Sequence, residues 1–86
     1  MRINVTKEDI KNGTRSNSTK CPIALAITRK ILGNIVVTPT QIRQYYCYEC
    51  YIKRVSKKVT RFIYDYDEGK NVKPFYFYVK GFKYGK

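Results

Sequence analysis

The chain has 86 residues, enough for one small domain and too few for a second hydrophobic core, so multidomain enzyme architectures are excluded. Hydrophobic residues make up 43% of the sequence, with only three prolines and five glycines, which is typical of a folded domain. Eighteen Lys and Arg residues against six Asp and Glu residues give a net charge of +12, divided equally between residues 1–43 and 44–86. The charge therefore belongs to the domain and not to a basic tail, and it favours polyanionic partners such as nucleic acid, nucleotides or a membrane surface.

The charge also has a compositional explanation. Lys, Ile, Tyr and Asn together account for 35 residues, a bias typical of an AT-rich genome, which would raise the number of lysines without any functional cause. The same bias does not explain why only six acidic residues occur, because codons for Asp and Glu are also compatible with it. The scarcity of acids is therefore the part of the charge that points to an anionic partner.

At the N-terminus, residues 2–5 alternate between hydrophobic and polar side chains and predict a short strand. Thr6 and Asp9 have the spacing of a helix capping box, so one or two helical turns should follow and end near Gly13. Residues 14–20 are seven consecutive polar residues without a periodic apolar position, and they predict a loop.

A buried central helix is expected next. Pro22 suits its first turn and Gly33 its end. Ile23, Ala26, Ile27 and Ile31 share one face of this helix, and further apolar residues widen the stripe.

The β-branched run 35–38 predicts a buried strand that ends at Pro39. Aromatic and β-branched residues dominate 40–55, which favours a long strand or, preferably, a hairpin that turns near Cys47–Cys50. Ser56 is a suitable cap for a second amphipathic helix that closes at Gly69.

After Pro74, alternation of apolar and polar residues predicts a last strand over 75–80. The order is β-α-α-β-β-β-α-β, which predicts an α+β domain over residues 1–80, with an antiparallel or mixed sheet of four to five strands and two main helices on one face. Residues 81–86 are expected to form a basic C-terminal extension. Nine tyrosines exceed what so small a core can absorb, so we expect several of them on an open face or at the interface of a homo-oligomer.

The polar loop before the central helix is the first candidate site. A helix N-terminus presents free N–H groups and a positive dipole end to phosphate, and the loop adds hydroxyl groups and cations. The predicted ligand-binding residues of this loop are Arg15, Ser18, Thr19 and Lys20. The alternative is that Ser18 or Thr19 only caps the helix and the other side chains are solvated, and the loop matches no glycine-rich phosphate motif.

The hairpin region is the second candidate site. Cations and rings interleave there, a combination that binds phosphates by charge and bases by stacking. The predicted binding residues are Arg43, Tyr45, Tyr46 and Tyr48, with Tyr51, Lys53 and Arg54 in the same pattern. A similar interleaving would extend this surface if the strands are neighbours, and it comprises Tyr76, Tyr78, Lys80, Lys83 and Tyr84. The alternative is that the rings pack on the core.

Metal binding, cofactor binding and catalysis are not predicted. Cys47 and Cys50 form a C-x-x-C pair, but the chain has no histidine and only Cys21 as a further thiol. The odd number of cysteines fits reduced thiols. Without histidine there is no obvious base near neutral pH, and no Ser or Cys has an identifiable partner. The acids of residues 65–68 oppose the dipole of their helix and suggest pairing with a basic surface of a neighbouring subunit.

The sequence lacks an apolar run of the roughly 20 residues that a membrane span needs, and it has no signal-peptide pattern, so no membrane contact and a cytoplasmic location are expected.

Several segments together resemble small uncharacterised proteins of phages and prophages. They are I-x-V-T-x-x-D-I at residues 3–10, C-P-I-A-L-A-I at 21–27, V-x-R-F-I-x-x-x-D-x-G at 59–69 and P-F-x-F at 74–77. The resemblance implies a small accessory protein that acts by binding, either to nucleic acid or against host defence. One such class consists of anti-defence sponges, which are oligomers that sequester nucleotide immune signals.

The leading hypothesis from the sequence is a non-enzymatic homo-oligomer that binds a phosphate-bearing nucleotide, plausibly a cyclic nucleotide signal. The first alternative is sequence-tolerant binding of DNA or RNA through a basic aromatic surface. The second alternative is an inhibitor that docks on an acidic host protein.

Overall fold

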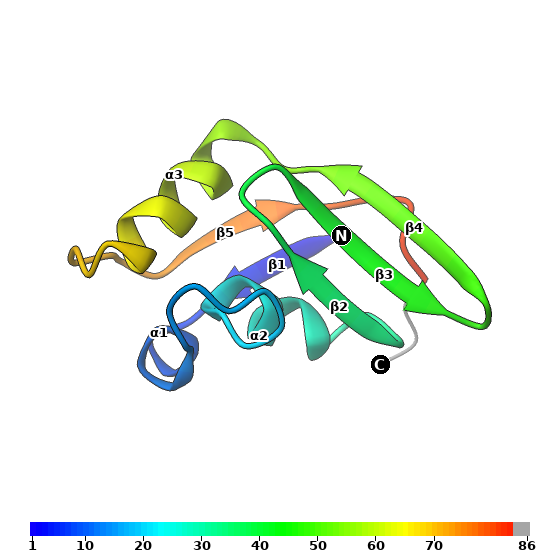
Figure 1. Ribbon diagram of the computed structural model, residues 1–86, viewed down its shortest axis with the longest axis horizontal. Coiled ribbons are helices and arrows are strands. Elements are labelled where there is room, and N and C mark those ends of the chain that lie inside the picture. The colour runs from blue at the N-terminus through cyan, green and yellow to red at the C-terminus, as the bar shows by residue number, and fades with distance from the viewer. Residues whose placement is uncertain (84–86) are drawn as a thin grey trace.

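The computed structural model describes residues 1–83 and folds them into helices and strands in the predicted order (Figure 1). In chain order the elements are β1 (Arg2–Val5), α1 (Lys7–Asn12), α2 (Pro22–Thr28), β2 (Asn34–Val37), β3 (Gln41–Tyr46), β4 (Glu49–Arg54), α3 (Lys57–Asp67) and β5 (Phe75–Tyr78). The α+β prediction is confirmed.

The five strands are all antiparallel, and they are divided between two sheets. β1 pairs with β5, and β2, β3 and β4 form a three-stranded sheet in that order. Helix α2 contacts both β1 and β2, so it packs against both sheets. The hairpin and β5 therefore do not form one continuous surface, because β5 pairs with β1 and not with a hairpin strand.

The core surrounds α2, as expected for a central helix. Five of its seven side chains are buried: Pro22, Ile23, Ala24, Ala26 and Ile27. The sheets and α3 contribute further buried residues, including Ile3, Val5, Ile35, Val37, Ile42, Val59, Phe62, Ile63 and Phe77. Each such aliphatic or aromatic side chain stabilises the fold by about 1.5–3 kcal/mol on transfer from water.

The helix starts follow the sequence at α1 and α3. The Thr6 hydroxyl accepts from the Asp9 N–H and the Asp9 carboxylate accepts from the Thr6 N–H, which completes the predicted capping box. Ser56 caps α3 as expected. At α2, however, the cap is Cys21, whose Sγ accepts from the Ala24 N–H at 3.4 Å, so neither hydroxyl of the preceding loop serves this role.

The hairpin turns at Cys47 and Tyr48, within the predicted span. Both residues have positive φ, 53° and 64°, so this is the two-residue turn whose twist matches that of the flanking strands. Asn-Gly would adopt it more readily than Cys-Tyr, which explains why the sequence indicates the turn only weakly.

The folded domain continues beyond residue 80, where we expected it to end. Phe82 is a core residue, 5% exposed. The Gln44 side chain, fully buried on β3, accepts from the Lys83 N–H at 2.8 Å and donates to the carbonyls of Lys83 and Leu32. Residues 84–86 of the predicted extension lie outside the described residues.

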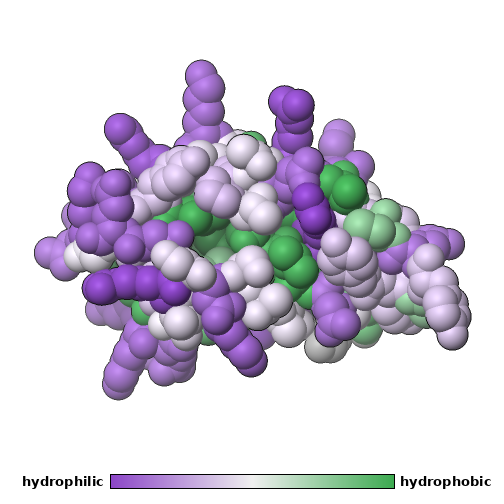
Figure 2. Space-filling view, viewed as in Figure 1, coloured by the Kyte–Doolittle hydropathy of each residue, from purple (hydrophilic) through white to green (hydrophobic). Residues whose placement is uncertain are grey.

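No helix within residues 1–83 combines the length and the hydropathy needed to cross a bilayer. Figure 2 shows long hydrophilic side chains projecting around the rim of the molecule, with hydrophobic residues visible in a hollow near the middle of the viewed face.

Candidate functional site

The outer face of the β1/β5 sheet brings together exposed rings and a cation. Because side chains alternate along a strand, Ile3, Val5 and Phe77 point into the core, and the residues between them point outward. The outward set is Arg2, Asn4, Tyr76 and Tyr78, in which Arg2 is paired with Tyr78 and Asn4 with Tyr76. We call these four residues the aromatic face.

The rings of this face are held in place and remain accessible. The guanidinium carbon of Arg2 lies 4.2 Å from the ring centroid of Tyr76, within cation–π range. The Tyr76 and Tyr78 rings meet edge to face with centroids 5.8 Å apart. Tyr76 is 45% and Tyr78 68% exposed, so both side chains are accessible from solvent.

Further cations line both edges of this sheet. At the β1 edge, Lys30 Nζ donates to the Arg2 carbonyl at 3.0 Å, and Arg29 Nη2 donates to the Asn4 carbonyl at 3.1 Å. At the β5 edge, Lys58 Nζ donates to the Tyr76 carbonyl at 3.2 Å and lies 5.2 Å from the Tyr76 ring. The aromatic face is therefore flanked by positive charge on two sides.

One of these cations is anchored by a buried carboxylate. Arg29 forms an ion pair with Asp9, including a hydrogen bond of 2.8 Å to Oδ2. Burial by itself raises the pKa of the Asp9 carboxyl, but hydrogen bonds from Arg29 and Thr6 outweigh that effect and hold its pKa below the ordinary value. The pair fixes the Arg29 side chain against β1.

The polar loop uses much of its hydrogen-bonding capacity internally. Asn17 Oδ1 accepts from the Thr19 N–H, the Thr19 hydroxyl and the Lys20 N–H at 2.9–3.0 Å. The Cys21 N–H donates to the Asn17 carbonyl. These are the donors that a phosphate at this helix start would need, so the loop resembles a closed turn more than an open anion site.

The surroundings of the loop are also less positive than its sequence indicates. The Ser16 N–H donates to Asp67 Oδ1 at 2.8 Å, and the Arg15 guanidinium lies against Gly69 at the end of α3. A hollow of about 220 Å³ beside the loop is lined by Ser18 and Asp67, among others. The carboxylate of Asp67 opposes entry of a phosphate there.

The hairpin residues do not form a single binding face. Arg43 and Tyr45 share the outer face of the three-stranded sheet, and Arg43 donates two hydrogen bonds to Gln41 Oε1. Tyr46 is on the opposite face by alternation, and Tyr48 is fully exposed in the turn. The predicted residues are thus distributed over two faces and a tip.

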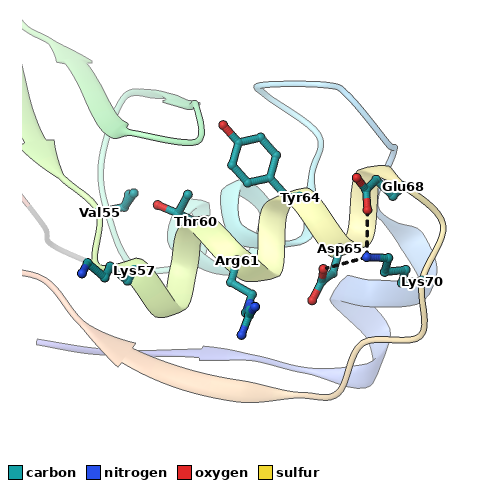
Figure 3. Close-up of a pocket in the computed structure, with 8 residues that line it drawn as sticks. All are labelled: Val55, Lys57, Thr60, Arg61, Tyr64, Asp65, Glu68 and Lys70. Atoms are coloured by element: carbon teal, nitrogen blue, oxygen red, sulfur yellow. Dashed lines mark ion pairs between the residues drawn. The ribbon is translucent and has the colours of Figure 1, made fainter.

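Helix α3 borders another hollow, of about 490 Å³, shown in Figure 3. Its charges largely neutralise one another. Lys70 Nζ lies 3.0 Å from Glu68 and 3.8 Å from Asp65, while Lys57 and Arg61 lie nearer the start of the helix. This hollow therefore offers no concentrated positive charge to a polyanion.

The cysteines give no metal centre. Cys47 and Cys50 are exposed, and Cys21 is buried, which raises the pKa of its thiol. Within residues 1–83, no three side chains of His, Cys, Asp or Glu are grouped so that they could hold a metal ion.

Two residues of the site, Arg2 and Lys58, are not predicted from the sequence. Tyr76 and Tyr78 were singled out as a cation–ring pattern, but Arg2 and Lys58 were not assigned to it, because nothing in the sequence indicates that β1 pairs with β5. The available signal was the alternation of residues 2–5, which places Arg2 and Asn4 on one face.

No protein-family model matches the chain, and neither the curated proteins nor the solved structures include a significantly similar one. The resemblance to phage accessory proteins stays a prediction.

Proposed function

We propose that the protein binds single-stranded nucleic acid on the aromatic face. The observation that carries this proposal is the pair of exposed rings, Tyr76 and Tyr78, with cations on the face and at both edges of the sheet. Proteins that bind single strands without sequence preference combine these two features.

Each feature has a distinct role. Every nucleic-acid base has a π-face, so bases can stack on Tyr76 and Tyr78 whatever their identity. Arg2 and Lys58 are close enough to the rings to contact the phosphates next to a stacked base. Bases in a duplex already stack on one another, so the proposed partner is an unpaired strand.

The nucleotide-sequestering hypothesis receives less support. Its central residues lie in the polar loop, where Asn17 already occupies backbone and side-chain donors and Asp67 adds negative charge. A role against host defence rests on the resemblance alone. Binding of a small nucleotide is accordingly treated as a competing outcome of the experiment below.

The test is fluorescence anisotropy of a labelled oligothymidylate with the purified protein at one fixed salt concentration. Stacking contributes about 1–3 kcal/mol per base, so the double variant Tyr76→Ala/Tyr78→Ala should bind at least roughly tenfold more weakly. Tyr76→Phe/Tyr78→Phe keeps both rings and should bind nearly as well as the wild type. Tyr64→Ala is the matched control, since Tyr64 is equally exposed on α3 but lies outside the face.

Equal affinity of the wild type and the double alanine variant would contradict the proposal. So would tight binding of a cyclic dinucleotide that is lost in Arg15→Ala while the oligonucleotide does not bind, because that pattern assigns the activity to the polar loop. A duplex of the same length should bind more weakly than the single strand and respond less to loss of the rings.

A further inference from the structure

Strand β4 has an outer edge whose backbone groups are free. The hairpin turn and the bond from the Val55 N–H to the Thr40 carbonyl show which β4 residues bond to β3. These are the odd-numbered residues, since hydrogen-bonded pairs alternate along an antiparallel ladder. The N–H and C=O groups of Cys50, Ile52 and Arg54 therefore point away from β3, and within residues 1–83 no hydrogen bond occupies them.

The other sheet edges are partly bonded in the part of the chain that the structure describes. Arg29 and Lys30 bond to the carbonyls of the β1 edge, and Lys58 bonds to the β5 edge. At the β2 edge, the Val37 N–H donates to the Ser18 carbonyl at 2.7 Å. Exposed edges are normally protected against pairing. Each of these three edges has at least one outward backbone group bonded, whereas within residues 1–83 no hydrogen bond reaches an outward backbone group of β4.

Most of β4 is exposed near this edge, although Tyr51 packs partly against the core and Lys53 lies against Gly81 on the inner face. Five of its six residues are exposed, and Ile52 is 50% exposed although it is a large aliphatic residue. An extended strand of this kind is a template for β-augmentation by another strand.

We propose that a second copy of the chain pairs antiparallel with β4, so that the two copies form a symmetric dimer with a two-fold axis at Tyr51. The axis places Cys50 opposite Ile52 of the partner subunit, and these residues can exchange hydrogen bonds through their free backbone groups. It also places Glu49 opposite Lys53 of the partner subunit, twice by symmetry.

Charge complementarity selects this arrangement. Glu49 and Lys53 lie on the same side of β4, four residues apart and centred on Tyr51. In an antiparallel pair about Tyr51 each carboxylate directly faces an ammonium group, in the closely spaced, non-hydrogen-bonded type of pair. A parallel, in-register pair would instead set Glu49 against Glu49 and Lys53 against Lys53. Of these two arrangements, only the antiparallel pair about Tyr51 sets opposite charges against each other.

The dimer extends the three-stranded sheet to six strands in the order β2-β3-β4-β4-β3-β2. Its interface lies on a different sheet from the aromatic face, so dimerisation leaves both copies of that face open. The inference is independent of the proposed function.

Charge reversal tests the proposal with the full chain. Native mass spectrometry and sedimentation equilibrium should show a dimer in the wild type at high protein concentration. Glu49→Lys places lysines opposite each other and Lys53→Glu places acids opposite each other, so each variant should raise the dimer dissociation constant about tenfold or more. Lys7→Glu and Glu8→Lys, at exposed sites on α1, are matched controls of equal charge change and should not alter it.

Mixing the two single variants is the decisive step. Every cross-strand pair in a mixed dimer is again of opposite charge, so the mixture should form a heterodimer while neither variant alone dimerises. The double variant Glu49→Lys/Lys53→Glu should dimerise with itself. A monomeric wild type at all concentrations, a dimer unaffected by either single variant, or a mixture that stays monomeric would each overturn the proposal.

Discussion

The two sheets differ in which of their surfaces is free. The β1/β5 sheet has side-chain donors along both edges and leaves its outer face exposed, with two rings and Arg2 on it. The three-stranded sheet has one outward group of β2 bonded to the polar loop, and within residues 1–83 no hydrogen bond reaches the outer edge of β4. A free face with rings suits a flat, negatively charged ligand, whereas a free edge suits another strand. Under the two proposals, ligand binding and self-association would therefore take place on different sheets.

The largest effect is expected from a variant that removes the hydrogen bonds between the three-stranded sheet and the segment that follows β5. Gln44 on β3 holds the backbone of Lys83, which follows β5 in the chain, with its buried amide. Gln44→Leu keeps the volume but leaves the Lys83 N–H without its partner and removes two bonds to carbonyls. We expect a loss of about 3 kcal/mol in the free energy of unfolding, measured by urea denaturation.

Gln41→Leu is the control for this variant, since Gln41 lies on the same strand and its side-chain oxygen accepts hydrogen bonds from Arg43 near the surface. It should cost well under half as much. Equal stability of wild type and Gln44→Leu would show that residues 81–83 do not hold the two sheets together.

Sequence reasoning succeeded where the signal is local. The Thr6–Asp9 capping box, the Ser56 cap and the apolar pattern of α3 each depend on residues within a few positions of one another. It succeeded less well at α2, which ends at Thr28 although apolar residues continue to Leu32. Arg29 and Lys30 leave the helix to cover the β1 edge, and this tertiary role has no local pattern.

The candidate site was predictable only in part, for the same reason. The alternating rings of β5 are visible in the sequence, but their neighbours come from β1 and α3, more than 70 and nearly 20 residues away. The polar loop has the composition of an anion site, yet its donors are used by Asn17, a choice that depends on side-chain rotamers. Composition favours an anionic ligand, which stays a prediction, whereas strand pairing decides where the residues meet.

A second variant opens the covered edge of β1. Asp9→Asn removes the charge that anchors Arg29, and we expect a loss of about 2 kcal/mol in the free energy of unfolding at neutral pH. Because the folded pKa of Asp9 lies below its ordinary value, its ionised form stabilises the native state at all pH values above that of the unfolded carboxyl. This contribution is lost as the pH falls through the folded pKa.

The stability difference between wild type and Asp9→Asn should therefore be constant near neutral pH and shrink below about pH 4. Thermal unfolding at a series of pH values measures it. A difference that grows on acidification would contradict the assigned role of the pair. Glu8→Gln, at the neighbouring exposed position, controls for the loss of one carboxylate in the same helix turn.

The smallest expected effect distinguishes the contribution of Lys58, at the β5 edge, from that of the two rings of the aromatic face. Lys58→Gln removes one phosphate contact, so the slope of log affinity against log salt concentration should fall by about 1, with a modest loss of affinity. Tyr76→Ala/Tyr78→Ala should weaken binding and leave the slope nearly unchanged, because stacking releases no counterions. Lys70→Gln removes an equally positive side chain that is paired with Glu68 on the far end of α3, and it should alter neither quantity. If Lys70→Gln and Lys58→Gln reduced the slope equally, the strand would be held by the overall charge of +12 rather than by the cations at the edge of β5.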